Sequence, residues 1–448
     1  MTSELRTVVL DDDPTGIQTV HGCRIITRWD PETVRSALCD EVPFFFVLTN
    51  TRALTPDAAR AKIAEIAGTV LVEAKKLGVR AVFVSRSDST LRSHFPLECN
   101  VIRAAMLDAE RAGAKEQTDI DALFLIPAFF EGGRITRNDV HLIRMQNEWI
   151  PTDRTEFAKD SVFGYSSSHL PSYIQEKAGV DGASVLSLSL ETLRTTEPEA
   201  LVDRLCSLRN GRYVVVNAES YADLERFCLA ARAALGAGKR FLFQTAASFV
   251  KAFTATPDVG LLGSGVSMDP RTHPRGLIVV GSHVQKSSEQ LACLLQEPEV
   301  RGVEIDVQRV LEDGPPYLTR MVTEIECIWN EGVTPVVFTS RAELPFPTTG
   351  ERLEAGQRVS RFLSSMVRVV RLPLRFLISK GGITSHDLLV DGLELSSARV
   401  LGQIAPGVPV IRIPEGHRLA GVPYVIFPGN VGGATTLREV FHTLSDVE

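Results

Sequence analysis

The sequence predicts an α/β fold with two α/β domains, whose mainly parallel sheets face each other across a cleft. Three observations lead to this prediction. Short apolar runs alternate with longer helical segments, which is typical of parallel strand–helix–strand units. Most of the runs are Val, Ile, Leu and Phe without polar alternation, as expected for strands buried on both faces. Finally, one stretch near the middle of the chain interrupts this pattern.

Twelve apolar runs are predicted to be strands, in two series of six. The first series covers residues 7–11, 43–48, 80–85, 122–126, 213–216 and 241–244. The second series covers residues 276–280, 302–305, 335–339, 375–379, 408–411 and 422–427. The three phenylalanines at residues 44–46 are interpreted as core strand residues and not as a surface on which ligands stack.

The clearest helix prediction covers residues 56–77. Thr55 and Pro56 begin an amphipathic pattern, and Gly78 follows its last residue. A capping hydroxyl, a proline in the first turn and a terminal glycine are the usual start and stop signals of a helix.

Residues 254–274 are predicted to be a linker. They contain three prolines and three glycines and show little periodicity, which separates a domain of residues 1–253 from a domain of residues 275–448. Clefts between domains and the carboxyl ends of parallel strands are the favoured positions for small-molecule sites.

The composition limits the function classes. The chain has 448 residues, 44% of them hydrophobic and 23% charged, as in ordinary globular proteins. Its net charge is −7 and it has no long basic run, so no nucleic-acid partner is expected, and an anionic substrate must be held by local arginines. We see no signal peptide and no apolar stretch near the ~18 residues of a membrane span, which predicts a cytoplasmic protein without membrane contact.

The seven cysteines are scattered and form no C-x-x-C pair. They are predicted to be reduced, mostly buried thiols of a cytosolic protein, and no zinc spacing is present. His21, His94, His141 and His283 have no clear partner in the sequence, so they are interpreted as core or surface histidines and not as catalysts.

Three aspartates follow the first predicted strand, in the segment Asp-Asp-Asp-Pro-Thr-Gly at residues 11–16. Carboxylates this close repel one another, so full ionisation is disfavoured unless a cation or a substrate donor compensates. The segment is a candidate for a general base, a magnesium contact or a ligand of a substrate hydroxyl. The alternative is a solvated turn that caps the next helix.

A second polar segment, Ser-Arg-Ser-Asp-Ser-Thr-Leu-Arg-Ser-His at residues 85–94, also follows a strand. Arg86 and Arg92 offer forked donors to a carboxylate or a phosphate, and Asp88 could bind sugar hydroxyls or accept a proton. The alternative is a polar loop that contains an Asp–Arg pair.

A third segment, Pro-Ala-Phe-Phe-Glu-Gly-Gly-Arg-Ile-Thr at residues 127–136, combines two glycines with Arg134. The glycines would let the backbone approach a ligand closely, and the arginine would supply a cation. A simple glycine turn with an exposed arginine would have the same sequence.

The second half has three glycine-containing turns after strands. Residues 279–283 (Val-Val-Gly-Ser-His) precede a helix that begins near Gln285, so Ser282 could contact a phosphate or cap the helix. Residues 379–386 (Ser-Lys-Gly-Gly-Ile-Thr-Ser-His) open onto another helix but lack the Walker A spacing. Residues 427–433 (Phe-Pro-Gly-Asn-Val-Gly-Gly) follow the last strand. Together the three turns favour a nucleotide phosphate site.

With these six motifs, in order over nearly the whole chain, the sequence resembles the four-carbon acid sugar kinase family, which includes D-threonate, D-erythronate and 3-oxo-tetronate kinases. Residues 12–16 match the Asp-Asp-Leu-Thr-Gly of typical members. Residues 86–93 match Lys-Val-Asp-Ser-Thr-Leu-Arg-Gly, and residues 127–136 match Pro-Ala-Phe-Pro…Gly-Arg-Thr-Thr.

The resemblance implies a substrate domain over residues 1–253, a nucleotide domain over residues 275–448, and transfer of the ATP γ-phosphate to a terminal hydroxyl of a four-carbon sugar acid. The expected cofactors are ATP and Mg²⁺, no metal ligand can be assigned, and a homodimer is a possible assembly. The implied catalytic residues are Asp12 and Asp88. The implied substrate-side residues are Asp13, Thr15, Arg86, Ser89, Thr90, Arg92, Gly133 and Arg134. The implied ATP-side residues are Ser282, Gly381, Gly382, Ile383, Thr384, Ser385, Gly429 and Asn430.

The chain departs from the family pattern in three motifs. Arg86 stands where the family has Lys, and Ser93 where it has Gly. The usual Gly-Glu-Thr-Ser-Gly is altered at Ile383 and His386, and the usual Lys-Ser-Gly-Asn-Phe-Gly begins with Phe427 and Pro428. The Asp-Asp-Asp-Pro-Thr-Gly form at residues 11–16 looks like that of a divergent branch of the family.

The hypothesis is that arginines of the first domain hold the substrate carboxylate while Asp12 or Asp88 accepts the proton of the attacking hydroxyl. The alternative is a non-catalytic sugar-acid sensor on a degenerate kinase fold, because an acidic position and a lysine position are lost. A nicotinamide oxidoreductase would need a G-x-G-x-x-G turn, and a serine hydrolase a G-x-S-x-G elbow, and neither motif is found.

Overall fold

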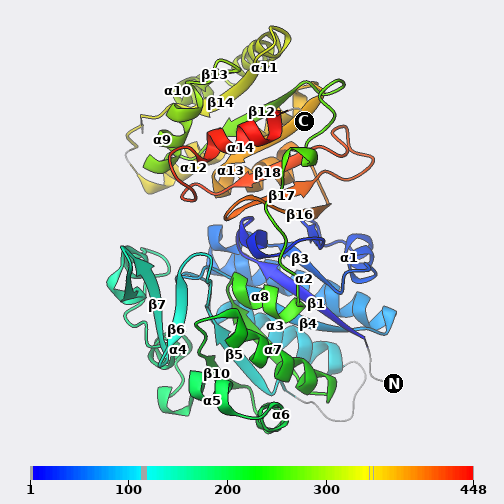
Figure 1. Ribbon diagram of the computed structural model, residues 1–448, viewed down its shortest axis with the longest axis vertical. Coiled ribbons are helices and arrows are strands. Elements are labelled where there is room, and N and C mark those ends of the chain that lie inside the picture. Colours follow the sequence, from blue (N-terminus) through cyan, green and yellow to red (C-terminus); the bar gives the residue numbers. More distant parts are fainter. Residues whose placement is uncertain (1–3, 112–118, 343, 347, 447–448) are drawn as a thin grey trace. The chain divides into compact units, whose positions relative to one another are not determined.

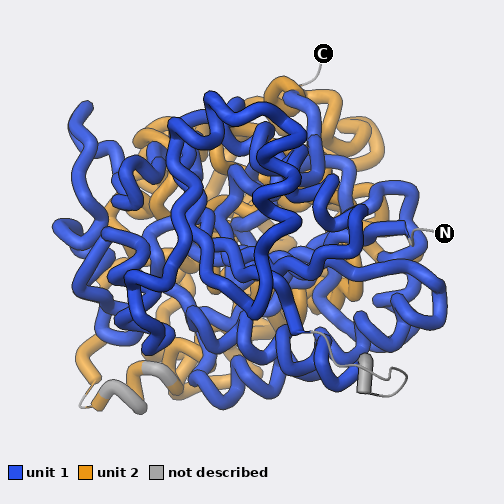
Figure 2. The backbone as a smooth tube through the Cα atoms, turned by 90° about the horizontal axis from the view of Figure 1, so that it is seen from below, with its two compact units in different colours: residues 1–258 blue, residues 259–448 orange. Residues whose placement is uncertain are grey.

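The chain forms two compact units, residues 1–258 and 259–448 (Figure 2). The computed structural model describes residues 4–111, 119–342, 344–346 and 348–446. The boundary between the units falls inside residues 254–274, a stretch in which a 3₁₀ helix at Ser264–Val266 is the one regular element after Thr254. Each unit has its own mainly parallel sheet with helices packed against it (Figure 1), so the predicted α/β class is confirmed.

The sheet of the first unit has the strand order β2–β3–β1–β4–β11–β5–β10–β9, and every neighbouring pair is parallel. The strands are β1 Leu5–Asp11, β2 Arg24–Ile26, β3 Phe44–Leu48, β4 Arg80–Arg86, β5 Ala122–Ile126, β9 Leu186–Leu188, β10 Arg212–Val216 and β11 Phe241–Thr245.

Helices cover both faces of this sheet, and successive residues of its strands therefore pack into different cores. Leu123 and Leu125 of β5 belong to a buried cluster with residues of α1, α2 and α3. Between them, Phe124 packs on Phe227 of α7, with ring centroids 5.1 Å apart. The helices of the unit are α1 Pro31–Leu38, α2 Pro56–Leu77, α3 Leu97–Arg111, α4 Leu170–Ala178, α5 Leu190–Thr195, α6 Pro198–Cys206, α7 Tyr221–Gly236 and α8 Ala247–Thr254.

A small antiparallel sheet lies beside the main sheet of the first unit and was not predicted. It consists of β6 (Arg134–Arg137), β7 (Val140–Met145) and β8 (Glu148–Pro151). Thr136 of β6 joins it to the segment after β10 through a bridge with Ala218. The three short strands carry many charged residues, so their sequence lacks the apolar runs on which the strand predictions depended.

The sheet of the second unit has the order β13–β14–β12–β15–β18–β17–β16. The first five strands are parallel, and β17 and β16 are antiparallel to their neighbours. The strands are β12 Arg275–Val280, β13 Val300–Ile305, β14 Thr334–Thr339, β15 Leu374–Lys380, β16 Ser397–Ala405, β17 Val408–Arg412 and β18 Pro423–Phe427.

The helices of the second unit pack on its strands and on each other. Leu291 of α9 and Leu437 of α14 share a buried core with Ile278 and Val425 of the central strands. Tyr317 of α11 stacks on Phe362 of α12, with ring centroids 5.4 Å apart. The helices are α9 Gln285–Leu294, α10 Val307–Glu312, α11 Pro315–Asn330, α12 Thr349–Val369, α13 Gly382–Asp387 and α14 Thr436–Ser445, and a π-helical turn at Leu388–Gly392 follows α13.

All twelve predicted strands are present, with boundaries within two residues of the prediction. The helix prediction for residues 56–77 is also confirmed. The Thr55 hydroxyl accepts a hydrogen bond from the Ala58 N–H, and Gly78 ends the helix with φ 70°. The prediction missed β2 and β9, which have three residues each, and β16, whose buried residues alternate with partly exposed ones.

The cysteine prediction was partly wrong. All seven cysteines are free thiols, but Cys23, Cys99 and Cys228 are the three that are buried. Cys39 caps the end of α1 and Cys327 lies on α11, and both are exposed. The error has a simple cause, since cysteine is small enough to occupy a helix surface and its spacing in the sequence carries no information on burial.

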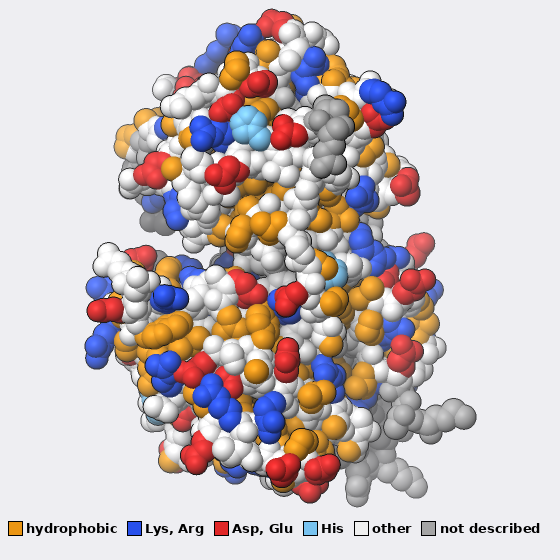
Figure 3. Space-filling view, viewed as in Figure 1, with side chains coloured by type: hydrophobic (Ala, Val, Ile, Leu, Met, Phe, Trp, Pro, Cys, Tyr) orange, Lys and Arg blue, Asp and Glu red, His pale blue; other side chains and the backbone are white. Residues whose placement is uncertain are grey.

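Within the described residues, no helix is both long and apolar enough to cross a membrane. On the face of the molecule shown in Figure 3, acidic and basic side chains are interspersed, so that face presents no continuous basic surface.

Candidate active site

The first two polar segments meet at the carboxyl edge of the first sheet. Asp11, the last residue of β1, is in register with Arg86, the last residue of β4, and with Leu48, the last residue of β3. The loops that follow these strands therefore begin side by side, and the Asp12 N–H donates to the Arg86 carbonyl at 3.2 Å. Gly16 is required here, because a Cβ at this position would lie 2.0 Å from Asp11 Oδ2.

Arg52 lies at the centre of this edge and was not predicted. It belongs to the 3₁₀ turn Thr51–Ala53 after β3. Its guanidinium forms an ion pair with Asp13, and its Nη1 lies 3.8 Å from Asp88 Oδ1. Burial lowers the pKa of Arg52, but Asp12, Asp13 and Asp88 outweigh that effect and raise it. The cation that the three aspartates need is thus supplied by the protein itself.

Asp12 is the acid of this site that has no hydrogen-bond donor. Its side chain is 2% exposed, and neither carboxylate oxygen accepts a hydrogen bond from any described residue. The nearest cation is Arg86, whose Nη1 lies 3.8 Å from Asp12 Oδ1. Burial raises the pKa of Asp12 well above its usual value. A buried carboxyl without donors favours the protonated form until a ligand supplies a donor.

Its neighbour Asp11 is also affected by burial, which raises its pKa to about 7. Arg86 Nη1 donates to Asp11 Oδ1 at 3.1 Å and opposes this rise. Asp11 and Asp12 are therefore the carboxyls of the aspartate segment that resist ionisation, as was predicted for the segment as a whole.

Asp13 and Asp88, in contrast, are fully engaged carboxylates. Asp13 accepts hydrogen bonds from the backbone N–H and hydroxyl of Thr15 at 2.8 and 2.5 Å. Asp88 accepts one from Arg92 Nε at 2.7 Å and one from the Thr90 hydroxyl. Burial alone would raise both pKa values, but the arginines around them and these hydrogen bonds lower them. Both carboxylates are therefore charged at neutral pH, and the predicted Asp–Arg pair is present.

Arg134 differs from the other arginines of the first unit's site. Arg52, Arg86 and Arg92 all form salt bridges with aspartates, whereas Arg134 forms none with a described carboxylate. Its Nη1 donates to the Gly132 carbonyl at 2.5 Å, and its Nε has no hydrogen-bond partner in the described chain. Burial lowers its pKa, and Asp88 and Arg92 lie near enough to affect it. Arg134 is thus a desolvated cation without an anionic partner in the described part of the chain.

The turn before Arg134 shapes this position. Gly133 has φ 66° and packs on Arg144 of β7, so a Cβ there would lie 3.1 Å from the Arg144 Cβ. Gly132 is equally restricted, because an added Cβ would lie 2.1 Å from Arg134 Nη1. The glycine pair therefore shapes the turn itself, but Arg134 is partly buried and not exposed, as it would be in the simple glycine turn that was the alternative.

Buried residues behind the site hold its loops. Glu98 of α3 accepts hydrogen bonds from the Thr51 hydroxyl at 2.5 Å and the Ser85 hydroxyl at 2.9 Å, and burial raises its pKa. His141 Nε2 lies 2.7 Å from the Ser89 carbonyl, and burial lowers its pKa to about 4. Glu98 positions the turn that carries Arg52, while neutral His141 anchors Ser89, whose side chain is buried.

In the second unit, the three glycine turns after β12, β15 and β18 converge. A Cβ on Gly381 would lie 3.0 Å from the Ser282 Cβ, and a Cβ on Gly429 would lie 2.8 Å from the Ser282 hydroxyl oxygen. The Ser287 hydroxyl lies 2.9 Å from both the Ser282 hydroxyl and the Gly429 carbonyl. The parallel order β12–β15–β18 brings together segments separated by about 150 residues of sequence.

Ser282 does not cap a helix, so that alternative is wrong. The cap of α9 is Val284, two residues further on. Arg341, in the segment after β14, donates from Nη1 to the Ser282 carbonyl at 2.7 Å.

The predicted residues of the second turn are arranged in two ways. Gly381 has φ 118° and precedes α13, whose first residues are Gly382 and Ile383, and the Ile383 side chain is 68% exposed. Thr384 and Ser385 are buried, and the Ser379 hydroxyl donates to the Ser385 hydroxyl at 2.7 Å. The Ser385 side chain is therefore committed to the protein interior.

Gly429 is partly exposed, and Asn430, which follows it, is exposed. Behind this turn, Lys380 is completely buried at the end of β15, in register with Phe427. Its Nζ donates to the Pro428 carbonyl at 2.6 Å and lies 4.0 Å from the Phe427 ring centroid. Burial, with a smaller effect from Lys286, lowers the pKa of Lys380 to about 7. Phe427 stands where typical family members have lysine. Lys380 is in register with Phe427 on the neighbouring strand β15, so this chain has an amine close to that position.

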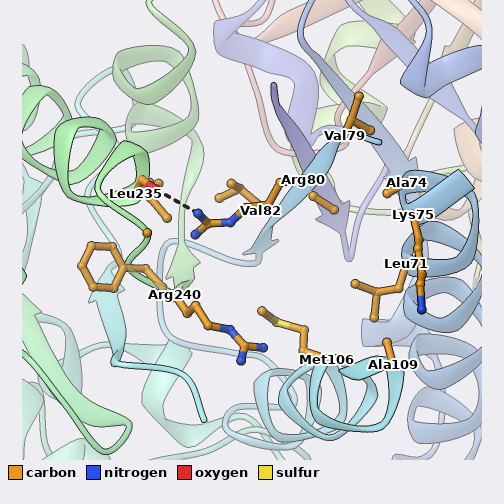
Figure 4. Close-up of a pocket in the computed structure, with 13 residues that line it drawn as sticks. Leu71, Ala74, Lys75, Val79, Arg80, Val82, Met106, Ala109, Leu235 and Arg240 are labelled. Atoms are coloured by element: carbon orange, nitrogen blue, oxygen red, sulfur yellow. Dashed lines mark hydrogen bonds between the residues drawn. The ribbon is translucent and has the colours of Figure 1, made fainter. Parts of the chain in front are cut away.

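A cavity of about 530 Å³ lies at the other edge of the first sheet. Figure 4 shows it between α2, α3 and the segment before β11, with Leu71, Met106 and Arg240 around it. Arg80, the first residue of β4, donates to the Leu235 carbonyl at 2.9 Å. The cavity opens at the amino ends of the strands, whereas the polar segments follow their carboxyl ends, so it is not part of the candidate site.

Comparison with known proteins agrees with the division of roles between the two units. Residues 7–253 match the family described as the sugar-binding N-terminal domain, and residues 277–437 match the one described as the nucleotide-binding C-terminal domain. The chain is therefore a two-domain protein that combines a sugar-binding domain with a nucleotide-binding domain. It belongs to the four-carbon acid sugar kinase family, as the sequence motifs predicted. A search of curated proteins found no match.

Two solved structures share the fold over nearly the whole chain. Haemophilus influenzae protein HI1011, of the DUF1537 family, is 15% identical over 98% of this chain and 100% of its own, with a TM-score of 0.64. A Salmonella typhimurium LT2 protein described as a candidate tRNA synthase is 16% identical over 97% of this chain and 98% of its own, with a TM-score of 0.69. A Bordetella bronchiseptica DUF1537 protein, a domain-swapped dimer with bound citrate, is 19% identical over 99% of both chains, with a TM-score of 0.42.

Proposed function

We propose that this protein is an ATP-dependent kinase that phosphorylates a terminal hydroxyl of a four-carbon sugar acid. The observation that carries the proposal is the orphaned carboxyl of Asp12, which is buried among charged neighbours and accepts no hydrogen bond from a described residue. A substrate hydroxyl is the kind of donor that this carboxyl lacks. A carboxylate that orients an attacking hydroxyl and accepts its proton is a recurring part of phosphoryl-transfer sites.

Of the two aspartates considered as the base, Asp12 is the better candidate. Asp88 is bound by Arg92 and Thr90, and its lowered pKa makes it a weak proton acceptor. Burial raises the pKa of Asp12, so its carboxylate is the stronger proton acceptor of the two. Asp88 and Asp13 would instead keep Arg52 and Arg92 in place around the substrate.

Arg134 is the best candidate for binding the substrate carboxylate. It is desolvated, it has no described carboxylate partner, and its Nε is unsatisfied. An arginine fork can bind a carboxylate through two parallel hydrogen bonds. The acid group of the substrate would complete the charge balance that the protein leaves open at this arginine.

The nucleotide phosphates are proposed to bind at the three converging turns, where Ser282, Gly382, Ile383, Gly429 and Asn430 are at least partly exposed and Gly381 is buried. The described residues contain no group of three or more His, Cys, Asp or Glu that could hold a metal ion. Mg²⁺ generally keeps several waters and binds through substrate phosphates with one or two carboxylates. Mg²⁺ would therefore arrive with ATP and neutralise charge on its phosphates. We further propose that residues 1–253 and 275–448 act as the substrate and nucleotide domains.

The test is an ADP-release assay on the purified full chain with Mg²⁺–ATP and each stereoisomer of threonate, erythronate and 3-oxo-tetronate. We expect one acid to give ADP and a monophosphate ester, identified by mass and by ³¹P NMR. A sensor without catalysis would show a thermal shift with a sugar acid but none with Mg²⁺–ATP, and no product. That pattern would replace the kinase proposal with the sensor.

A further inference from the structure

A cation beside the Ser282 turn is not among the residues that the sequence motifs point to. Arg341 follows β14 and is half-buried. Its Nη1 donates to the Ser282 carbonyl at 2.7 Å, its Nε to the Thr339 carbonyl at 3.1 Å, and its Nη2 to the Thr339 hydroxyl at 3.1 Å. These contacts fix the guanidinium against the turn while leaving N–H donor capacity on Nη2, since each Nη carries two protons.

Arg341 has no acidic partner among the described residues. It forms no salt bridge with any carboxylate of the described chain, and Glu304 is the one acid near enough to affect its pKa. Burial nevertheless lowers that pKa, so its charge is incompletely solvated and incompletely paired. Arginine stays protonated in proteins, so an anion bound beside Arg341 would stabilise its charge.

The surroundings of Arg341 add to the positive charge. Lys380 lies beneath the Gly429 turn, and Lys286 is close enough to lower its pKa. Neither forms a salt bridge with a carboxylate in the part of the chain that the structure describes. The three turns thus meet near the basic residues Arg341, Lys380 and Lys286, and the backbones of Gly381 and Gly429 pack closely on Ser282. Such a combination suits a ligand that carries several negative charges.

We propose that Arg341 binds the phosphate chain of the nucleotide at the Ser282 turn and makes the site selective for nucleotides with more phosphates. The inference rests on the proposed nucleotide function of the second unit, which it extends with a specific residue. It predicts that affinity rises from adenosine to ADP to ATP, and that Arg341 is responsible for much of this rise. Hydrogen bonds to charged groups contribute roughly 1.5–3 kcal/mol, which is roughly a 10- to 100-fold effect on affinity.

The experiment is calorimetric titration of the full chain, without sugar acid, with Mg²⁺–ATP, ADP and adenosine. It compares the wild type with Arg341→Gln and with Arg275→Gln. Arg275 is the matched control, because it is a partly buried arginine that donates to a carbonyl, that of Trp329, at 2.9 Å. It lies at the opposite end of β12 from Ser282. Thermal unfolding of all three proteins monitors folding.

We expect Arg341→Gln to weaken ATP binding roughly 10- to 100-fold, to weaken ADP binding less, and to leave adenosine binding and the unfolding temperature nearly unchanged. Arg275→Gln should bind all three ligands like the wild type. The inference is wrong if Arg341→Gln binds ATP normally, if it loses adenosine and ATP equally, or if Arg275→Gln loses as much. Failure of the wild type to bind any nucleotide would overturn both this inference and the proposed function. ATP binding that depends on Arg341, without turnover of any sugar acid, would support this inference and overturn the proposed kinase activity.

Discussion

In both units, polar loops follow the carboxyl ends of the parallel strands, but the charged residues there are arranged in opposite ways. In the first unit, acids and arginines are interlocked, so that Arg52, Arg86 and Arg92 each have an aspartate partner. In the second unit, Arg341 and Lys380 contact carbonyl groups, and neither has a carboxylate salt bridge among the described residues. The paired edge leaves two specific groups open, Asp12 and Arg134, whereas the cationic edge offers a general attraction for phosphate. We therefore infer that the carboxyl edge of the first unit selects the sugar acid, and that the carboxyl edge of the second unit binds the charged phosphates of the nucleotide.

The strongest test of this comparison is Asp12→Asn. Removing the base should lower kcat by roughly 10²- to 10⁴-fold, with little change in ATP affinity, because ATP is assigned to the other edge. In the wild type, kcat/KM should fall as the pH decreases through the raised pKa of Asp12, because protonated Asp12 cannot accept a proton. Initial rates across pH measure both effects.

The matched control is Asp121→Asn, since Asp121 pairs with Lys239 at the opposite edge of the same sheet, 2.8 Å from Nζ. Normal turnover in Asp12→Asn would remove Asp12 from the mechanism and return the role to Asp88.

The next largest effect is expected from Arg134→Gln. Loss of the carboxylate-binding cation should raise KM for the sugar acid roughly 10- to 100-fold and leave KM for ATP unchanged. Steady-state kinetics with each substrate varied in turn measure this. Arg144→Gln, an exposed arginine on β7 of the same small sheet, is the control. A change in KM for ATP instead would mean that the two edges do not divide their roles as proposed.

Lys380 allows a test of the cationic edge through stability. Its pKa is about 7 in the folded protein, against about 10.4 in an unfolded chain. Between these values the folded state binds fewer protons than the unfolded state, so the free energy of unfolding should rise with pH. The expected rise from Lys380 is about 2 kcal/mol between pH 7 and pH 9. Denaturant unfolding of the wild type and of Lys380→Met at both pH values should show this rise in the wild type alone, and equal slopes would contradict it.

The smallest effect concerns the contact between two turns. In Gly429→Ala, the added Cβ would meet the Ser282 hydroxyl at 2.8 Å, so the turns must separate slightly. We expect ATP affinity to fall about 3- to 10-fold, since small steric changes cost roughly 0.5–1.5 kcal/mol. Gly356→Ala on α12, where an added Cβ would contact nothing within 4 Å, is the control. Unaltered ATP titration in Gly429→Ala would separate the Gly429 turn from the nucleotide site.

Much of the fold could be predicted because strands buried on both faces have a strong local signal. The twelve apolar runs and the polar segments directly after them were visible in the sequence, and parallel pairing brings such segments to one edge. The same reasoning missed β16, whose alternating burial gives no continuous apolar run. It also missed the charged strands of the small sheet that begins with Arg134.

The missed site residues have a different cause. Arg52 follows an apolar strand, as the recognised segments do, and that position was its only signal in the sequence. Its importance comes from the pairing of β3 with β1, which places it beside Asp13, 39 residues away. Arg341 likewise becomes a candidate only through its contact with Ser282, which is 59 residues away in the sequence. Glu98 is a single acid on a helix, and only its burial distinguishes it from a surface residue.

The small antiparallel sheet has a consequence for how such a protein can diversify. Arg134 stands on β6, which is not a strand of the main sheet and joins it through the Thr136–Ala218 bridge. Asp12, Asp13 and Asp88 follow strands of the main sheet itself. Insertions or shifts in the small sheet could therefore move the anchoring cation to suit acids of other lengths without disturbing the proton-accepting group. Relatives with new substrates should accumulate their changes there first.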